Sequence, residues 1–252
     1  MAAGERVVLV TGASRGIGRA VAQRFAAQGA TVVVHYASND DAAKVTLAGL
    51  TGDGHRALSA DLADPEAVES LVRRVVAEYG RIDVLVNNAA VYEAHPVLST
   101  SYAQWRDSWR RTIDTNLIGP ANLIHEVVPR MVANGGGRIV NVSSRGAFRG
   151  EPGHTAYGAS KAGLNSFGQS LAQELAPHGI YVTTVAPGFV ETDMAATLLG
   201  GPAGESIRAQ SPMGRVATAD EIARVVVFLA SPGSEATTGA IVDVNGASYL
   251  RT

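Results

Sequence analysis

The chain of 252 residues contains no cysteine. That absence excludes disulfide bonds, a thiolate nucleophile and any metal site built on cysteine. Lysine is almost absent too, because Lys44 and Lys161 are the only two among the 21 lysines and arginines. A lysine in a chain that otherwise uses arginine therefore indicates a position where arginine does not serve.

Excess charge and long apolar runs are also missing. A formal net charge of -2 with dispersed arginines gives no basic surface for nucleic acid. No apolar run approaches the length of a membrane span, and the N-terminal stretch lacks the apolar core of a signal peptide. We therefore expect a cytoplasmic protein that binds neither membrane nor nucleic acid. The six histidines show no ligand spacing, so no metal site is expected.

What the chain does contain is an alternation of short β-branched runs and longer amphipathic segments. Continuous apolar runs such as VVLV, TVVV and DVLV are typical of strands buried on both faces of a parallel sheet. The alternation predicts a doubly wound α/β domain. Strands are predicted at Arg6–Val10, Thr31–His35, His55–Ser59, Val84–Asn87, Arg138–Ser143, Tyr181–Ala186 and Ala240–Val244. Helices are predicted near Ile17–Gln28, Asp40–Leu50, Pro65–Tyr79, Tyr102–Val132, Thr155–Ala176 and Ala219–Ala230.

No Pro- or Ser-rich linker and no internal repeat divides the chain, so residues 1–252 are predicted to form a single domain. One stretch is less regular and contains Gly200, Gly201, Pro202 and Gly204. We expect residues 190–212 to form a mobile substrate lid between the last two strand units.

Glycines mark the turn after the first predicted strand. In VVLVTGASRGIGRA, Gly12, Gly16 and Gly18 stand between this strand and the first helix. Glycines there allow close backbone approach, and the free N–H groups of the helix suit a pyrophosphate. The spacing G-x-x-x-G-x-G differs from the G-x-G-x-x-G fingerprint, so a plain turn of small residues is the alternative.

Tyr157 and Lys161 lie four residues apart in HTAYGASKAGLNSFGQSLAQEL, and one helical turn would put both on the same face. A free phenol has a pKa of about 10 and a neighbouring ammonium favours the phenolate. We therefore expect Lys161 to lower the pKa of Tyr157, which makes the tyrosine a candidate acid/base for ketone reduction. An exposed surface lysine is the alternative.

Taken in order, several short motifs resemble the short-chain dehydrogenase/reductase family across essentially the whole chain. The resemblance implies a single Rossmann-type doubly wound domain with a seven-stranded parallel sheet, usually assembled as a homotetramer. The motifs are TGASRGIG, Asp61-Leu62, Asn87-Asn88-Ala89-Ala90, Asn116, Ser144 with Tyr157 and Lys161, and Pro187-Gly188 with Thr192.

The resemblance also implies roles for the catalytic candidates. Tyr157 would be the acid/base, and Lys161 would modify its pKa and bind the cofactor ribose. Ser144 would hydrogen-bond the substrate carbonyl, although its neighbour Ser143 is a rival by sequence alone. Asn116 would hold a water that relays protons to Lys161, and a buried structural amide is the alternative.

By the same resemblance, the glycine turn would hold the pyrophosphate and Asp61 would meet the adenine. Asn88 would line the cleft between adenosine ribose and nicotinamide, and Val190 and Thr192 would contact the carboxamide. Asp61 as a helix cap and Asn88 as a tie between strands are the alternatives. The expected cofactor-binding residues are Gly12, Ser14, Arg15, Gly16, Ile17, Gly18, Tyr36, Ser38, Asn39, Asp61, Leu62, Asn88, Tyr157, Lys161, Val190 and Thr192.

The end of the second strand indicates which dinucleotide is preferred. A carboxylate there binds the ribose 2′-OH of NAD(H) but repels the 2′-phosphate of NADP(H). The region reads HYASND, which places Tyr36 at the acidic position. Arg15, Ser38 and Asn39 could receive a phosphate, so NADP(H) is expected over NAD(H). Ala37 stands where many NADP-dependent members have a second arginine.

PGFVETDM and the following stretch from Ser211 to Gly246 look most like the 3-oxoacyl-acyl-carrier-protein reductases. The expected activity is NADPH-dependent reduction of a 3-oxoacyl thioester or similar ketone to a secondary alcohol. Gly135 and His178 stand where basic side chains for an acidic carrier protein are common, which argues against delivery by a carrier. Arg145 and Arg149 either steer an anionic substrate or are solvated.

Two further hypotheses stay open on the sequence. One is a sugar or secondary-alcohol dehydrogenase that works in the oxidative direction. The other is a regulatory protein that binds NADP(H) without turnover, which the presence of Ser144, Tyr157 and Lys161 argues against. Trp105 and Trp109 fall four residues apart in a predicted helix and are expected to serve packing or subunit contact rather than base stacking.

Overall fold

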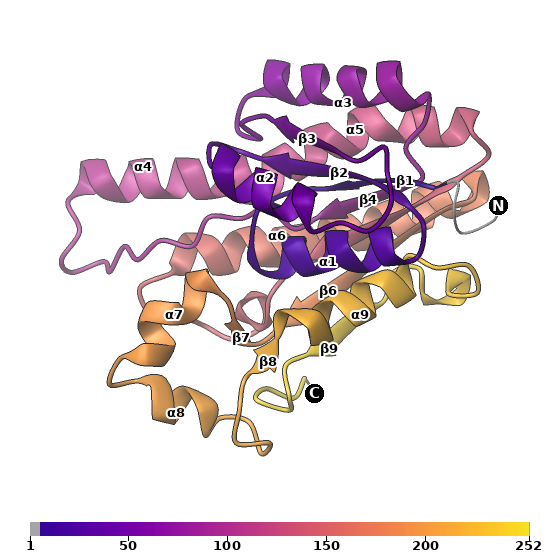
Figure 1. Ribbon diagram of the computed structural model, residues 1–252. Coiled ribbons are helices and arrows are strands. Elements are labelled where there is room, and N and C mark those ends of the chain that lie inside the picture. The colour runs from indigo at the N-terminus through magenta and orange to yellow at the C-terminus, as the bar shows by residue number, and fades with distance from the viewer. Residues whose placement is uncertain (1–5, 252) are drawn as a thin grey trace.

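The computed structural model describes residues 6–251 and centres on a seven-stranded parallel sheet in the order β3-β2-β1-β4-β5-β6-β9. Helices cover both faces of this sheet (Figure 1). The predicted doubly wound α/β fold is therefore confirmed. The strands are β1 (Val7–Val10), β2 (Thr31–Tyr36), β3 (Arg56–Ser59), β4 (Val84–Asn87), β5 (Gly137–Val142), β6 (Ile180–Pro187) and β9 (Ile241–Val244).

Helices α1 and α9, with α2, cover one face of the sheet, and α3, α5 and α6 cover the other. Their bounds are α1 (Gly16–Ala27), α2 (Asp40–Ala48), α3 (Pro65–Tyr79), α4 (Tyr102–Ile113), α5 (Gly119–Ala133), α6 (Thr155–Leu175) and α9 (Ala219–Leu229). Short 3-10 turns follow β5, α6 and α9 at η3 (Arg145–Ala147), η4 (Ala176–His178) and η5 (Glu235–Thr237).

The apolar strands are buried on both faces because successive side chains point to opposite sides. In β1, Val8 and Val10 belong to the core cluster beneath α1 and α9, whereas Val7 and Leu9 belong to the cluster beneath α3 and α5. Phe25 of α1 is fully buried in the first cluster. The sheet is packed on both faces by these two core clusters, so the loops that follow its strands start from well-packed positions.

The predicted helix Tyr102–Val132 is wrong in one respect, because a π-helical turn, η2 (Asp114–Ile118), separates α4 from α5. Pro120 has no N–H to donate to the carbonyl of Asn116, so the regular α-helical ladder is interrupted there. Helix α4 projects from the body in Figure 1, and of its residues only Thr112 is fully buried. The other predicted elements begin and end within two residues of the observed ones.

Between β6 and β9 the chain forms a separate two-stranded pair that the sequence did not predict. Strand β7 (Val190–Glu191) pairs in parallel with β8 (Ala217–Thr218), and helices α7 (Asp193–Gly200) and α8 (Gly204–Arg208) lie between them. Two-residue strands carry too little periodicity to be recognised in a sequence. In Figure 1 this segment lies below the sheet, in orange.

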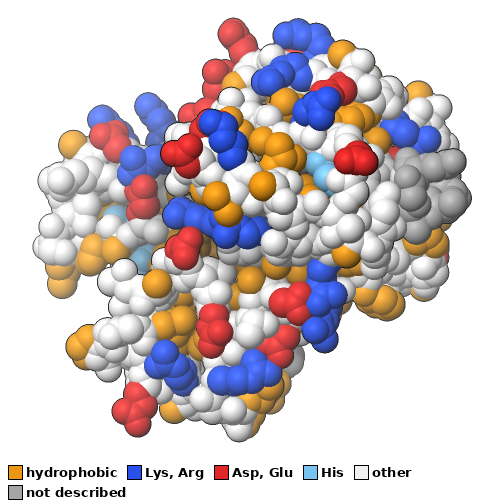
Figure 2. Space-filling view, viewed as in Figure 1, with side chains coloured by type: hydrophobic (Ala, Val, Ile, Leu, Met, Phe, Trp, Pro, Cys, Tyr) orange, Lys and Arg blue, Asp and Glu red, His pale blue; other side chains and the backbone are white. Residues whose placement is uncertain are grey.

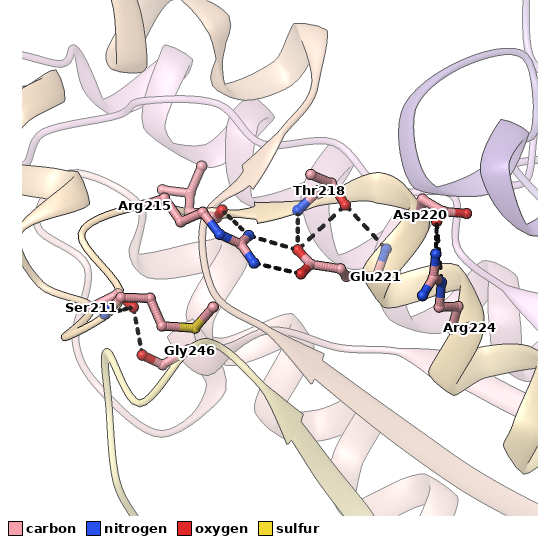
Figure 3. A network of polar contacts seen from close by, with 9 residues as sticks. Ser211, Arg215, Thr218, Asp220, Glu221, Arg224 and Gly246 are labelled. Atoms are coloured by element: carbon pink, nitrogen blue, oxygen red, sulfur yellow. Dashed lines mark hydrogen bonds and ion pairs between the residues drawn. The ribbon is translucent and has the colours of Figure 1, made fainter.

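A capping box fixes the return from this segment to α9 (Figure 3). Thr218 Oγ1 accepts a hydrogen bond from the Glu221 N–H at 3.2 Å, and the Glu221 carboxylate accepts one from the Thr218 N–H at 2.9 Å. The same carboxylate binds both terminal nitrogens of Arg215, at 2.8 and 2.7 Å. The segment that carries α7 and α8 is thus tied to the first turn of α9.

Candidate functional site

The main cavity lies at the carboxyl ends of the parallel strands, between β1 and β4, where the strand order reverses. It has a volume of about 520 Å³ and is lined by residues that follow β1, β2, β4, β5 and β6. Figure 2 shows the surface hollowed between the body of the sheet and the segment that carries α7 and α8. Parallel strands therefore bring distant parts of the sequence to one edge.

Most of the predicted site residues line this one cavity, and only Gly18 and Asn116 are absent from its wall. Residues that are far apart in the sequence, from Gly12 to Thr192, thus meet around a single cavity. The predicted residues that line it are Gly12, Ser14, Arg15, Gly16, Ile17, Tyr36, Ser38, Asn39, Asp61, Leu62, Asn88, Ser144, Tyr157, Lys161, Val190 and Thr192.

The glycine turn has the geometry that a close-packed phosphate loop requires. Gly12 and Gly16 have positive φ angles of 61° and 56°, a backbone region that side chains rarely adopt. At Gly18 an added Cβ would lie 2.4 Å from the Gly12 carbonyl oxygen and 2.6 Å from Asn88 Nδ2. Gly18 is therefore needed for the packing of the turn itself. Because it packs against Gly12 and Asn88, it does not line the cavity.

The N-terminus of α1 faces the cavity without a cap of its own. Arg15 occupies the N-cap position and makes no side-chain capping hydrogen bond, and the first turn has no acidic residue. Free N–H groups and the positive end of the helix dipole remain available to an anionic group. Within residues 6–251, no hydrogen bond or ion pair engages the Arg15 guanidinium, which is exposed.

His35 supports the turn from beneath. Its Nδ1 accepts a hydrogen bond from the Gly12 N–H at 3.1 Å, so Nε2 carries the proton and donates to the Ala60 carbonyl at 3.0 Å. Burial lowers the pKa of His35 to about 4, and the ring is neutral at physiological pH. Asn88 Nδ2 donates to the carbonyls of Thr11 and Gly12, so it ties β1 to β4 while also lining the cavity.

The polar groups after β2 and β3 are partly engaged within the chain. Tyr36 donates its hydroxyl proton to Asp40 at 2.7 Å, and Lys44 pairs with the same carboxylate at 2.6 Å. Asn39 Oδ1 accepts from the Ala42 N–H and so caps α2, which leaves the Asn39 amide group to donate. Asp61 Oδ1 accepts from the Ala63 N–H, whereas the cap of α3 is Asp64.

Ser144, Tyr157 and Lys161 converge on the same part of the cavity. Ser144 follows β5 and its hydroxyl accepts the Gly146 N–H at 3.0 Å, whereas the Ser143 hydroxyl is buried and donates to the Lys161 carbonyl. Tyr157 and Lys161 lie one turn apart at the start of α6, with the ammonium 5.7 Å from the phenol ring centroid. Ser144 is therefore the serine whose hydroxyl faces the phenol.

The expected depression of the Tyr157 pKa is wrong for this arrangement. Burial raises the pKa of Tyr157 to about 12, and hydrogen bonding from Ser144 only partly opposes the rise. Lys161 donates to the Val142 carbonyl at 2.8 Å, and burial lowers its own pKa to about 8. Since desolvation disfavours the charged form of both groups, it outweighs the attraction that their spacing led us to expect.

Comparison with known proteins gives one consistent result. The sequence model of the family described as enoyl-(acyl carrier protein) reductase matches residues 12–247. The 3-oxoacyl-[acyl-carrier-protein] reductase FabG of Escherichia coli strain K12 is 40% identical over 246 residues, which are 97% of this chain and 98% of that protein. FabG of Staphylococcus aureus strain Mu50 is 38% identical over 244 residues, 96% of this chain and 97% of that protein.

A solved structure agrees in fold as well as in sequence. The crystal structure of a short chain dehydrogenase from Burkholderia cenocepacia J2315 in complex with NADP matches with a TM-score of 0.89. Its sequence is 33% identical, and the match covers 98% of this chain and 99% of that one. The chain belongs to the short-chain dehydrogenase/reductase family. It is an oxidoreductase that acts on carbonyl or hydroxyl groups.

Asn116 does not itself line the cavity of this dehydrogenase/reductase, but lies in the π-helical turn η2 directly behind Val91, which does. Its side chain is fully buried, with Oδ1 accepting from the Val91 N–H and Nδ2 donating to the Val91 carbonyl and to Ser160 Oγ. Both N–H groups of the amide are thus engaged. This geometry fits the buried structural amide, and the relay of protons through a water held by Asn116 stays a prediction.

Several residues of the cavity wall were not among the predicted catalytic and cofactor-binding residues. Tyr92, Glu151 and Phe189 line it together with Arg145, and Tyr92 packs edge-on against Tyr157 at 4.8 Å between ring centroids. They come from the loops after β4, β5 and β6. Their position after the strand ends was the available signal, because every parallel strand opens onto this edge.

No group of three or more histidine, aspartate or glutamate side chains within residues 6–251 is arranged to hold a metal ion. Over the same residues, no helix is both long enough and apolar enough to cross a membrane.

Proposed function

We propose that this enzyme uses NADPH to reduce a ketone to a secondary alcohol, with a 3-oxoacyl thioester or a similar compound as substrate. The observation that carries the proposal is the meeting of Ser144, Tyr157 and Lys161 with the glycine turn around one cavity. The relatives support the substrate class, since two of them are named 3-oxoacyl-[acyl-carrier-protein] reductases.

The chain's own geometry fits a dinucleotide. A cradle at Gly12 and Gly18 leaves no room for Cβ atoms, the first turn of α1 has no side-chain cap, and the cavity continues from there to Tyr157. We assign the pyrophosphate to the turn at Gly12, Ser14, Gly16 and Ile17. We assign the adenine to Asp61 and Leu62. We assign the nicotinamide to Asn88, Val190 and Thr192.

The 2′-phosphate would be held by Arg15, Ser38 and the amide of Asn39. Arg15 is exposed beside the turn and engages no partner among the described residues, so its charge is available. Tyr36 fills the position where a carboxylate would repel a phosphate. The nearby Asp40 does not restore that repulsion in full, because the Lys44 ammonium pairs with it at 2.6 Å and compensates its negative charge.

The nicotinamide of a bound cofactor supplies the hydride in such a reduction. Ser144 would donate a hydrogen bond to the ketone oxygen and so stabilise the negative charge that develops on it. Tyr157 would then give its phenolic proton to the same oxygen. Lys161 would bind the ribose through its ammonium, as a compact charge at the end of a flexible stem can do.

The protonation state of Tyr157 bears on which step the free site is ready for. A phenol with a pKa of about 12 is protonated at neutral pH, which is the form that donates to an alkoxide. Oxidation of an alcohol would require the phenolate, and that form is scarce at pH 7. The raised pKa therefore fits proton donation to an alkoxide, and kinetics in both directions distinguish a reductase from the sugar or secondary-alcohol dehydrogenase that the sequence left open.

The proposal includes a single domain over residues 1–252 with a lid over 190–212. Met194 and Leu198 of α7 support the lid, since they line the cavity and yet expose 49% and 36% of their surface. We also propose a homotetramer in the cytoplasm. The exposed Phe228 and Leu250 near the C-terminus support contact between subunits, because large apolar side chains at the surface favour burial against a partner.

The test is a fluorescence titration with NADPH and with NADH, followed by turnover of a 3-oxoacyl thioester by wild type and by Tyr157→Phe. We expect tight NADPH binding, weaker NADH binding, and a fall in kcat of about 100-fold or more in the variant. The control is Tyr102→Phe, which removes the same hydroxyl from an exposed position on α4. Full activity of Tyr157→Phe would refute the mechanism, and binding of neither dinucleotide would refute the proposal as a whole.

A further inference from the structure

Arg145 is a buried cation in the wall of the catalytic cavity. It follows Ser144 directly, begins the 3-10 turn η3, and exposes only 3% of its side chain. Burying an arginine is costly unless its donors are paired. Because the guanidinium is buried beside Ser144, its N–H groups need hydrogen-bond acceptors, either within the chain or on a ligand.

Partners within the chain hold only part of the guanidinium. Nε lies 3.4 Å from Glu151 Oε1, Nη1 donates to Ser248 Oγ at 2.9 Å, and the guanidinium stacks over the Phe189 ring at 4.7 Å from its centroid. These contacts come from three different loops and hold the fork in one orientation. No hydrogen bond of Nη2 is made within residues 6–251, so this nitrogen keeps donors for a ligand.

The local charge argues against a carboxylate as that ligand. Glu151 lines the same cavity, exposes 18% of its side chain and compensates the charge of Arg145. The neighbouring phenol of Tyr92 stays neutral, because burial raises its pKa to about 12. An anion would meet the guanidinium and the Glu151 carboxylate together, whereas an uncharged acceptor meets only a fixed donor.

We propose that Arg145 donates a hydrogen bond from Nη2 to a second, uncharged carbonyl oxygen of the substrate, such as the thioester or ester carbonyl of a 3-oxoacyl compound. This inference rests on the proposed reductase function and names a residue that determines its specificity. Consecutive residues would then hold both oxygens, with Ser144 on the ketone and Arg145 on the second carbonyl.

Two ketones of matched length test the proposal. Ethyl acetoacetate carries the second carbonyl, and 4-ethoxybutan-2-one has a methylene in its place. For Arg145→Gln we expect kcat/KM to fall about 10- to 100-fold on the ester and to stay within about threefold on the ether, because a hydrogen bond from a charged donor accounts for a loss of that size. Free acetoacetate should be a poorer substrate than its ester, and Glu151→Gln should narrow that difference.

The control is Arg149→Gln, which removes an arginine that also approaches Glu151, at 4.0 Å, but does not line the cavity. It should reduce both ketones at the wild-type rates. Arg145→Lys serves if the glutamine variant does not fold, as judged by NADPH titration and thermal unfolding. It keeps the charge but loses the fork, so it should also lose activity on the ester alone.

Equal losses on the ester and the ether would overturn the proposal, because Arg145 would then act on the fold of the site. No loss on either ketone would overturn it as well. A wild type that prefers free acetoacetate would show that Arg145 binds a carboxylate, against the proposal. Failure of the wild type on every ketone would instead refute the proposed reductase, and this inference with it.

Discussion

At the scale of single residues, burial acts on Tyr157 and Lys161 in opposite directions. It disfavours the phenolate and the ammonium alike, so the pKa of the tyrosine rises to about 12 and that of the lysine falls to about 8. A buried lysine with such a pKa changes charge within an accessible pH range. Lys161 can therefore be examined through the binding of an anionic ligand.

We predict that the affinity for NADPH is nearly constant up to about pH 7 and weakens as the pH rises through 8, approaching at most about tenfold per pH unit above it. The phosphates of the ligand raise the pKa of Lys161 in the complex, so binding takes up a proton wherever free Lys161 has lost its own. Fluorescence titrations from pH 7 to 9.5 measure this slope. Lys161→Met should abolish it.

The chain offers a matched control in its other lysine. Lys44→Met removes an exposed ammonium that pairs with Asp40, outside the wall of the cavity. This variant should keep the wild-type pH dependence. If Lys161→Met kept it too, another group would be responsible for the proton uptake.

His35 gives a second residue-scale prediction, on stability. Its pKa of about 4 in the folded protein lies below the ordinary value of 6.5, so the unfolded chain binds this proton more readily between those two pH values. The stability that His35 contributes is present above pH 6.5 and is lost as the pH falls toward 4, by up to about 3 kcal/mol.

Urea unfolding at pH 7, 5.5 and 4.5 measures this loss. His35→Asn should show a smaller loss, because its amide oxygen can still accept the Gly12 N–H without titrating. His125→Asn changes a histidine that exposes 85% of its side chain and should behave as wild type. A wild-type slope in His35→Asn would assign the acid sensitivity to other groups.

For Tyr157 and Lys161, the sequence predicted the relative positions of the side chains better than their protonation states. Tyr157 and Lys161 share a helix face because the helical repeat requires it, and that geometry is visible in the spacing. The sign of the Tyr157 shift depends on how deeply the fold buries the phenol, which no spacing reveals. The partners of Arg145 likewise come from three loops that only tertiary packing brings together.

At the scale of elements, the first turn of α9 anchors the segment that carries α7 and α8. Glu221 completes a capping box with Thr218 and also binds Arg215 through both of its oxygens (Figure 3). A second capping box, Ser101 with Gln104 at the start of α4, has no such link to another segment among residues 6–251. Substitutions in the two boxes therefore distinguish the loss of a helix cap alone from the loss of the link to Arg215.

We predict that Glu221→Ala makes the segment that carries α7 and α8 more accessible to trypsin, with cleavage after Arg208 and Arg215 several times faster than in wild type. Loss of the carboxylate frees Arg215 and so raises the population of locally open forms. Limited proteolysis with mass analysis of the fragments measures the two rates. Gln104→Ala should leave them unchanged, and equal rates in Glu221→Ala and wild type would refute the anchor.

The elements that the sequence predicted are those with strong local patterns. The runs VVLV and DVLV became β1 and β4 because buried parallel strands need continuous apolar side chains. The turn η2 was missed, since Pro120 interrupts the ladder without ending the helix. Strands β7 and β8 were missed because they are two residues long and depend on pairing across the segment that carries α7 and α8.

At the scale of the whole molecule, the parallel sheet explains why so much of the site was predictable. Residues that follow β1, β4, β5 and β6 meet at one edge of the sheet, whatever the length and sequence of the connecting loops. The cavity opens at this edge, where the strand order reverses. The loops decide the rest. They supply Tyr92, Glu151 and Phe189 to the cavity wall, and loops on a rigid scaffold are where binding residues are most often found.

The proposed tetramer makes a prediction at the same scale. Helix α9 packs its buried face, including Ile222 and Val226, toward α1, while Phe228 exposes 60% of its surface. We predict that the wild type sediments at four times the 26.1 kDa of one chain and that Phe228→Glu sediments at a lower mass. A charge placed in an apolar contact between subunits costs more than the same charge in water.

Sedimentation velocity over a range of protein concentrations measures both masses. The matched control is Val45→Glu on α2, which places the same charge at an apolar side chain that is 62% exposed. It should keep the wild-type mass, because an added surface charge by itself does not dissociate subunits. If Phe228→Glu also kept that mass, the tetramer would be held through another face, and the projecting helix α4 with Trp105 and Trp109 would be the next surface to substitute.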